Sequence, residues 1–310
     1  MQNKKILIIG AFGFMGKNVV KVFEDSNYEI FKESRKTGLD LSDLTTVEKK
    51  ISLIKPDIII NCAAHVGSMP YVAKYPADVF FDNSLMYLNL YKAVKNIDEN
   101  ILIINPISNC SYPGIIDVQD EENWWDGKIH ESVESYGMPK KVGFILSECF
   151  RKQYKIKTIN LIIPNAYGPE DYLDAERTHA MNGIIFRMLN SQKNNEKVFQ
   201  VWGTGEPIRE WIYMPDVARI IKNIIDEKKF DLPNPINLGQ EFGISIKETV
   251  YIIKQKLNLD INIEFDISKP DGAPKKVLGN KLFSLYFSNF NFTNYEKGIE
   301  QTIKYYEDLI

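Results

Sequence analysis

The sequence predicts a doubly wound α/β fold, a parallel sheet with helices on both faces, followed by a smaller C-terminal α/β cap. Short apolar runs rich in Ile and Leu alternate with segments whose apolar residues have helical spacing. The runs lack polar alternation, as expected for strands that are covered on both faces. A glycine-rich turn, residues 10–16, joins the first run to the first helical segment.

The elements follow one another in a regular order. The expected strands are residues 5–9, 28–31, 57–61 and 101–104. The expected helices are the segment after Gly16 and residues 45–53, 79–94 and 181–190. Past residue 165 the chain is richer in Pro, Gly and aromatic residues. We therefore expect a first domain over residues 1–165 and mainly a cap over 166–310, with some later segments returning to the first domain and a ligand cleft between the two.

Composition excludes several classes of protein. With 310 residues, of which 44% are hydrophobic, the chain can bury a large core. Its 38 basic and 41 acidic residues nearly cancel, so we expect no nucleic-acid partner. Cys62, Cys110 and Cys149 have no paired spacing, which argues against a disulfide scaffold or a metal site and favours the reducing cytoplasm. No apolar run approaches the roughly 20 residues that span a bilayer, so we expect no membrane partner.

The glycines of the 10–16 turn indicate a dinucleotide site. Gly10, Gly13 and Gly16 would allow a tight turn from strand to helix and a close backbone approach to a pyrophosphate at the helix N-terminus. The spacing alone is a weak signal, and the alternative is a simple turn. Its place between a strand and a helix favours a cofactor-binding Rossmann domain. The residues that follow the third strand fit the same crevice, namely Cys62, Ala63 and Ala64.

The end of the second strand bears on the choice of nicotinamide cofactor. A carboxylate there would bind a ribose 2′-hydroxyl, whereas an arginine would bind a 2′-phosphate. The chain has both, since Glu33 precedes Arg35 and Lys36. The basic pair favours NADP(H), and NAD(H) stays open.

Three further residues indicate proton transfer. Tyr136 and Lys140 are one helical turn apart, so their side chains share a face, and Ser108 follows a strand. A nearby ammonium stabilises a phenolate, and a serine can bind both the phenol and a substrate oxygen. Each residue alone could be an ordinary surface or turn residue. Pro139 is tolerable if Tyr136 lies just before the helix and Pro139 lies in its first turn.

With these residues in place, the chain resembles the extended short-chain dehydrogenase/reductases and, among them, the GDP-L-fucose synthase (GDP-4-keto-6-deoxymannose 3,5-epimerase/4-reductase) family. The similarity runs nearly end to end. The segments that carry it are residues 74–78, 108–113, 136–140, 164–169, 201–205 and 268–272. The resemblance implies a GDP-linked 4-keto-6-deoxy sugar as substrate, NADP(H) as cofactor, and a homodimer formed through residues 79–94 and 140–153.

The resemblance also implies further cofactor contacts and a second activity. The additional cofactor residues would be Phe12, Phe14, Met15, Asp40, Leu41, Pro164 and His179, besides Tyr136 and Lys140. Cys110 and His179 would act as acid and base in epimerisation beside the sugar ketone, which acidifies the C3 and C5 protons. His179 could supply a charge that stabilises a Cys110 thiolate or return the proton from the other face. The bland alternatives are a small buried cysteine and a surface histidine.

Substrate contacts follow from the same resemblance. Arg187 and Arg209 would face the diphosphate and nucleotide, because guanidinium groups suit phosphate geometry, although either could form a surface ion pair instead. The other implied substrate residues are Ser108, Asn109, Asn165, Trp202, Lys269 and Asp271.

The chain departs from the family pattern at several positions. Phe12 replaces an arginine that helps to hold the 2′-phosphate, and Gly279 replaces an acidic residue. Tyr213 with Pro215 and Asp216 replaces a histidine and an acidic pair. Residues 171–177 of the substrate loop also diverge. The sugar could therefore be a hexose or a heptose.

Alternative functions remain in view. A 4,6-dehydratase would have an acidic pair where this chain has Asn109 and Cys110, which disfavours elimination. A C4 reductase without epimerase activity and a nucleotide-sugar 4-epimerase both stay open. The retained Ser108, Tyr136 and Lys140 argue against a non-catalytic nucleotide-binding protein.

Overall fold

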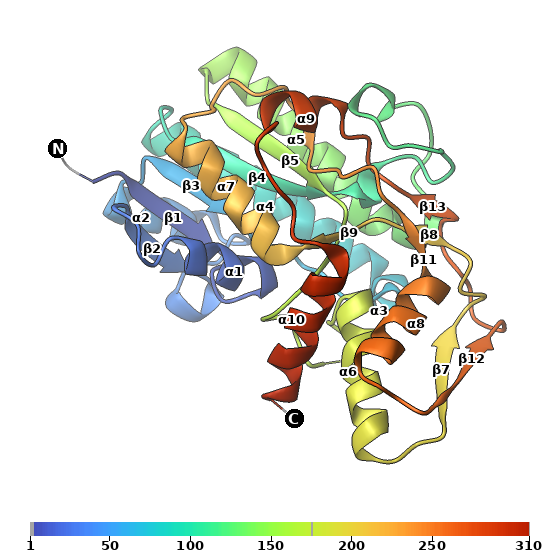
Figure 1. Ribbon diagram of the computed structural model, residues 1–310. Coiled ribbons are helices and arrows are strands. Elements are labelled where there is room, and N and C mark those ends of the chain that lie inside the picture. The colour runs from blue at the N-terminus through green and yellow to red at the C-terminus, as the bar shows by residue number, and fades with distance from the viewer. Residues whose placement is uncertain (1–2, 175, 310) are drawn as a thin grey trace.

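The computed structural model describes residues 3–174 and 176–309 and contains a six-stranded parallel sheet in the order β10-β5-β4-β3-β1-β2 (Figure 1). Its strands are β1 (Lys5–Ile9), β2 (Glu29–Glu33), β3 (Ile58–Asn61), β4 (Leu102–Ser108), β5 (Thr158–Ile163) and β10 (Ile236–Asn237). The strand order reverses between β1 and β3, which is where a doubly wound sheet binds its ligand. The predicted fold class is confirmed.

Helices cover both faces of this sheet. Ile6 and Ile8 of β1 pack with α1 (Phe14–Val22), α7 (Met214–Asp226) and α9 (Lys281–Tyr286) in one core. The alternate residues Leu7 and Ile9 face a second core. That second core is formed with α2 (Leu44–Ile54), α4 (Pro76–Ile97) and the C-terminal part of α5 (Glu134–Tyr154). β1 is therefore apolar on both faces, as the missing polar alternation predicts.

The second half of the chain contributes to two cores. β10 is an edge strand of the main sheet, and α7 and α9 pack on that sheet. A separate core gathers around α6 (Ala180–Lys193), α8 (Ile246–Lys256) and α10 (Tyr295–Glu307). Figure 1 shows these three helices together on the C-terminal side of the molecule. The smaller sheets are β12 (Asn262–Asp266) with β7 (Val198–Trp202), β6 (Asn165–Tyr167) with β9 (Trp211–Tyr213), and β11 (Ile244–Ser245), β8 (Ile208–Arg209) and β13 (Lys275–Lys276). The remaining helices are α3 (Met69–Lys74), η1 (Arg35–Thr37), η2 (Asn109–Ser111), η3 (Glu121–Asn123) and η4 (Glu131–Val133).

The start of α5 differs from the prediction. The helix begins at Glu134, so Tyr136 lies within its first turn and Pro139 lies inside the helix. The expectation that Tyr136 precedes the helix is therefore wrong. The short helix η4 runs directly into α5, which extends the helical backbone upstream of the proline.

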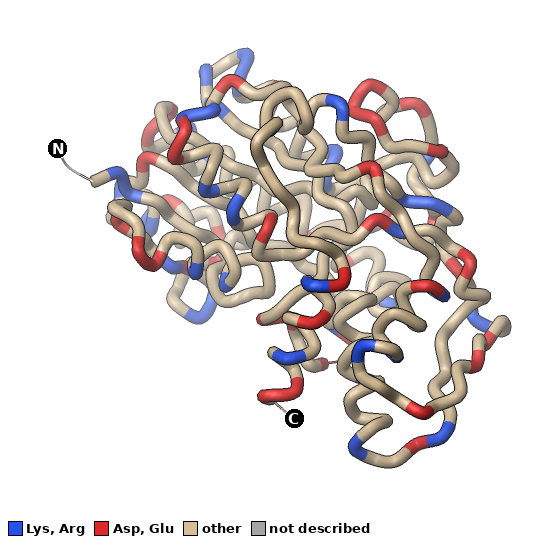
Figure 2. Tube along the Cα trace, in the orientation of Figure 1, with Lys and Arg blue, Asp and Glu red and all other residues tan. Residues whose placement is uncertain are grey.

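Charged residues of both signs are interspersed along the described trace (Figure 2). Within residues 3–174 and 176–309, no helix has the length and apolar character needed to cross a membrane. In the same part of the chain, no group of three or more His, Cys, Asp or Glu side chains is arranged to hold a metal ion.

Candidate active site

The parallel register brings the predicted residues to one edge of the sheet. Ile9 of β1 pairs with Asn61 of β3, and Ser108 of β4 pairs with Ile163 of β5. These four residues end their strands at the same carboxyl edge. The segments that leave the sheet there are residues 10–16, 62–64, 109–111 and Pro164.

Two glycines of the 10–16 turn are required by close backbone contacts. A Cβ at Gly10, which has a φ of +77°, would lie 2.7 Å from the backbone nitrogen of Ala63. A Cβ at Gly16 would lie 2.0 Å from the carbonyl oxygen of Gly10. A Cβ at Gly13 would lie 3.4 Å from the carbonyl oxygen of Gly10, an ordinary contact distance. The space beside Gly13 is therefore open.

The turn fits a dinucleotide pyrophosphate. Gly13 is the N-cap of α1, and in the described chain no side chain caps this helix and no acidic residue occupies its first turn. Its first backbone N–H groups and the positive end of the helix dipole thus suit an anion. Phe14 is buried beneath the turn, whereas Phe12 is 43% exposed.

At the end of β2 the basic residues are exposed, whereas the acidic residue is hydrogen-bonded to other side chains. The Glu33 carboxylate accepts hydrogen bonds from Lys50 at 2.8 Å and from Thr37 at 2.5 Å. Arg35 and Lys36 in η1 are exposed. Glu33 is therefore already engaged, and the side chains free to meet a ligand at this point are cationic.

Asp40 and Leu41 lie just beyond this segment. Asp40 accepts a 2.9 Å hydrogen bond from the backbone of Ser42, and Leu41 is buried. Their predicted cofactor contacts remain predictions, as do those of Met15 and Pro164.

Lys140 is buried between two phenols. Its Nζ lies 5.0 Å from the ring centroid of Tyr136 and 3.3 Å from the hydroxyl oxygen of Tyr87 on α4. Burial raises the pKa of Tyr136, and the Lys140 charge opposes this shift only in part. Tyr136 therefore keeps its proton at neutral pH and can act as an acid.

Cys110 has a basic partner that spacing does not reveal. Lys276 on β13 donates a 3.3 Å hydrogen bond from Nζ to the Cys110 Sγ. Burial acts to raise the pKa of Cys110, but Lys276, the Ser108 hydroxyl and the Arg209 charge together lower it. The neighbouring charge thus comes from Lys276 and Arg209, whereas the expected source was His179. Ser108 also accepts a 3.2 Å bond from the Cys110 backbone N–H.

His179 instead pairs with a carboxyl group. Its Nδ1 lies 3.0 Å from Oδ1 of Asp171, a residue of the divergent loop. Its ring packs on Phe14, with 4.9 Å between centroids, which places it against the helix that follows the glycine turn.

Four predicted substrate residues gather in the cap. Lys269 Nζ lies 6.0 Å from the ring centroid of Trp202, which is 57% exposed. Arg209 is buried, and it interacts electrostatically with Asp271 as well as with Cys110. Asp271 also accepts hydrogen bonds from the Thr204 backbone at 2.7 Å and from its hydroxyl at 2.8 Å, so its carboxylate holds the 203–205 turn.

The other predicted substrate residues have separate contacts. Arg187 donates to the carbonyl oxygen of Gln200 at 3.0 Å and lines a hollow of about 280 Å³ between α6 and β7. Asn109 is buried and donates to Gln119 at 3.3 Å. Asn165 donates to the carbonyl oxygen of Glu210 at 3.0 Å.

At Gly279, one of the departures from the family pattern, an acidic side chain from another segment occupies the adjacent space. A Cβ at Gly279 would lie 1.8 Å from Oδ1 of Asp120, so the Asp120 carboxylate occupies the space of a side chain at position 279. Tyr213, another departure, is buried and packs on Tyr167, with 5.5 Å between ring centroids.

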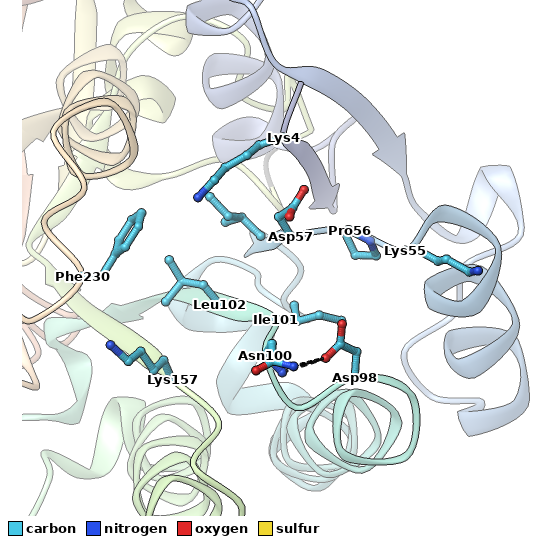
Figure 3. Close-up of a pocket in the computed structure, with 11 residues that line it drawn as sticks. Lys4, Lys55, Pro56, Asp57, Asp98, Asn100, Ile101, Leu102, Lys157 and Phe230 are labelled. Carbon is cyan, nitrogen blue, oxygen red and sulfur yellow. Dashed lines mark hydrogen bonds between the residues drawn. The ribbon is translucent and has the colours of Figure 1, made fainter. Parts of the chain in front are cut away.

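A second hollow lies at the opposite edge of the sheet (Figure 3). It has a volume of about 300 Å³ and is lined by residues near the amino ends of the strands, including Lys4, Asp57, Leu102, Lys157 and Phe230. None of the predicted site residues lines it. This hollow is therefore separate from the predicted site residues.

A tyrosine and a buried lysine one helical turn apart, together with an uncapped glycine turn that follows the first strand, are features of dinucleotide-dependent enzymes. The chain belongs to the NAD dependent epimerase/dehydratase family, whose model matches residues 6–239. It is thus an NAD(P)-dependent enzyme of the extended short-chain dehydrogenase/reductase type, as the resemblance predicts.

Comparison with individual proteins agrees with this assignment. The chain is 30% identical to GDP-L-colitose synthase of Yersinia pseudotuberculosis, over 97% of each chain. It is 26% identical to GDP-L-fucose synthase of Dictyostelium discoideum, over 98% of this chain and 96% of that protein. A GDP-L-fucose synthetase structure from Naegleria fowleri bound to NADP matches with a TM-score of 0.88 and 25% identity, covering 99% of this chain and 94% of that one.

Proposed function

We propose that this enzyme uses NADPH to reduce the C4 ketone of a GDP-linked 4-keto-6-deoxy sugar, either a hexose or a heptose. The observation that carries the proposal is the pairing of Tyr136 with the buried Lys140 on α5. The names of the similar enzymes, GDP-L-fucose synthase and GDP-L-colitose synthase, support a GDP-linked sugar.

The residues of the site have distinct roles in this reaction. When bound, the dinucleotide supplies a hydride to C4. Tyr136 donates its phenolic proton to O4, and Lys140 stabilises the phenolate that forms. Ser108 hydrogen-bonds the same oxygen and holds the ketone against the phenol. A protonated Tyr136 is the form this step requires, and burial favours that form.

The cofactor preference rests on the end of β2. Glu33 is engaged by Lys50 and Thr37, while Arg35 and Lys36 are exposed and suited to a 2′-phosphate. The related structure with bound NADP supports the same choice. NAD(H) is the alternative if a ribose 2′-hydroxyl displaces Lys50 from Glu33.

Epimerisation at C3 or C5 before reduction is a second proposed activity. It is favoured by the lowered pKa of Cys110, because a thiolate is the form that removes a carbon-bound proton. A C4 reductase without this activity is the alternative.

We propose a homodimer formed through α4 and α5. Phe81 and Leu88 on α4 are 63% and 47% exposed, and Ile145 on α5 is 49% exposed. Apolar side chains exposed on two helices that pack together suit a self-complementary interface.

The test is incubation with GDP-4-keto-6-deoxy sugars and NADPH. Loss of NADPH absorbance should accompany a C4 alcohol product identified by NMR. Binding of the ketosugar and NADPH without turnover would contradict the proposal and favour a non-catalytic nucleotide-binding protein.

A further inference from the structure

Asp171 is a buried carboxyl group that faces the ring of His179. Its side chain has 0% exposure, whereas the His179 side chain retains 29%. Oδ1 of Asp171 lies 3.0 Å from Nδ1 of His179, and Oδ2 accepts a 2.9 Å bond from the His179 backbone N–H. Asn182 donates a further 2.8 Å bond to Oδ2. Both oxygens therefore have donors, and Nδ1 is the ring nitrogen that faces the carboxyl group.

These contacts determine which nitrogen of His179 carries a proton. Burial acts to raise the pKa of Asp171, but its contacts with His179 and Asn182 lower it. An ionised carboxylate can only accept hydrogen bonds. The bond to Asp171 is therefore donated by Nδ1–H, and Nε2 is the nitrogen left to exchange protons.

The loop around Asp171 is fixed to the cofactor-binding helix α1. Lys17 forms a 3.1 Å ion pair with Glu170, and Asn18 donates a 3.0 Å hydrogen bond to the carbonyl oxygen of Pro169. The His179 ring rests on Phe14 of the same helix. The pair is thus held at the entrance to the glycine turn rather than on a loose loop.

We propose that Asp171 is the positioning residue for epimerisation: it holds His179 as the Nδ1–H tautomer and turns Nε2 toward the sugar. This inference rests on the proposed function. It adds that epimerisation requires Asp171, although this residue does not contact the substrate.

Inversion at C3 or C5 needs two proton transfers, one on each face of the carbon. The Cys110 thiolate takes a proton from C3 or C5, so that a C–H bond breaks, an S–H bond forms and the electron pair moves to O4 as an enolate. His179, protonated from solvent at Nε2, gives that proton to the opposite face of the same carbon, and the ketone re-forms. The thiol returns its proton to solvent. In deuterated water each inversion therefore places one deuterium on the carbon.

The first test reads the tautomer directly. The protein has three histidines, so two-bond ¹H–¹⁵N correlation spectra of the NADPH-bound enzyme resolve them, and His179→Gln assigns the signal. The wild-type enzyme should show neutral His179 with its proton on Nδ1. In Asp171→Asn the amide can donate to Nδ1, and the proton should move to Nε2. A wild-type signal with the proton on Nε2 overturns the inference whether or not any variant folds.

The second test measures deuterium incorporation into the ketosugar. Asp171→Asn should lower the incorporation rate about 10²- to 10⁴-fold, since the same carboxylate-to-amide change in a Ser-His-Asp triad costs about 10⁴-fold in kcat. Asp171→Glu keeps the charge and should recover much of the rate. In a His179→Gln background, Asp171→Asn should cause little further loss.

Glu176→Gln provides the matched control, because it removes a charge of the same sign from an exposed residue of the same loop. It should leave the rate within about twofold of wild type. If the wild type incorporates deuterium and Asp171→Asn does so at the same rate, this inference is overturned while the epimerase proposal stands. Absence of incorporation in the wild type would overturn the epimerase proposal and this inference with it.

Discussion

Replacing Lys276 by Met should destabilise the thiolate form of Cys110 and so raise the pKa of its thiol. The Lys276 Nζ lies 3.3 Å from the Cys110 Sγ, and the lysine is buried. At that separation and an effective dielectric constant of about 20, two unit charges attract by about 5 kcal/mol, an upper limit for the pair. Water and Arg209 replace part of this interaction in the variant. We therefore expect the pKa of Cys110 to rise, because the charge of Lys276 is the largest of the influences that lower it.

The pH dependence of alkylation by iodoacetamide measures this shift, because only the thiolate reacts. Peptide mass spectrometry follows Cys110 separately from Cys149, an exposed cysteine that serves as the reference within each sample. Lys275→Met is the matched control, since Lys275 is the neighbouring residue of the same strand and is less buried than Lys276. The Cys110 midpoint should rise in Lys276→Met and stay near the wild-type value in Lys275→Met. Equal midpoints in wild type and Lys276→Met would refute the assignment of Lys276 as the stabilising charge.

Two further predictions concern reduction and the cofactor. Tyr136→Phe should lower kcat for ketone reduction about 10²- to 10⁴-fold while NADPH still binds, because the phenol acts as the general acid. Near-normal turnover in this variant would remove Tyr136 from the mechanism, and fluorescence titration with NADPH checks binding. Changing Arg35 and Lys36 together to Ala should raise KM for NADPH far more than KM for NADH, since only NADPH has the 2′-phosphate. An equal effect on both cofactors would contradict the preference for NADPH.

The parts of the site that can be predicted from the sequence are local. The requirement for Gly10 and Gly16 follows from one tight turn, and the shared face of Tyr136 and Lys140 follows from a separation of one helical turn. The alternation of apolar runs and helical segments likewise predicts the parallel sheet. These inferences need only short-range geometry.

The remaining features depend on contacts between distant segments. Lys276 is 166 residues from Cys110 and reaches it from a two-residue strand in the cap. Asp120 fills the space beside Gly279 from a loop of the first domain, so the loss of an acid at one position is matched at another. Neither pair has a periodicity or spacing that would reveal it. The sequence marks Asp171 only as part of a divergent loop. Its contact with His179 depends on how that loop folds, which the sequence does not reveal.

The last prediction concerns how stability depends on the carboxyl group of Glu210, which is buried and joins three segments of the chain. Its oxygens accept backbone hydrogen bonds from Gln240 at 2.5 Å and Leu278 at 2.7 Å, and burial raises its pKa from 4.5 to about 8. As pH rises from 4.5 toward 8, the unfolded chain ionises this group before the folded protein does. The contribution of Glu210 to stability is therefore fully present below pH 4.5. It falls by about 1.4 kcal/mol per pH unit between pH 4.5 and about 8, or about 5 kcal/mol in all.

Glu210→Gln should separate the two effects of this carboxyl group. The amide offers one acceptor oxygen, so one backbone N–H loses its partner, and the variant should be less stable than wild type at pH 5 by about 1 to 3 kcal/mol. Because glutamine does not titrate, the stability of the variant should fall less with pH. The stabilities measured by urea unfolding should therefore cross between pH 5 and pH 8.5, with the variant the more stable at pH 8.5. The exposed Glu206 supplies the control, since Glu206→Gln should leave the pH dependence of the wild type intact. Parallel pH dependences for wild type and Glu210→Gln would show that Glu210 stays ionised in the fold, held by its two backbone donors despite burial.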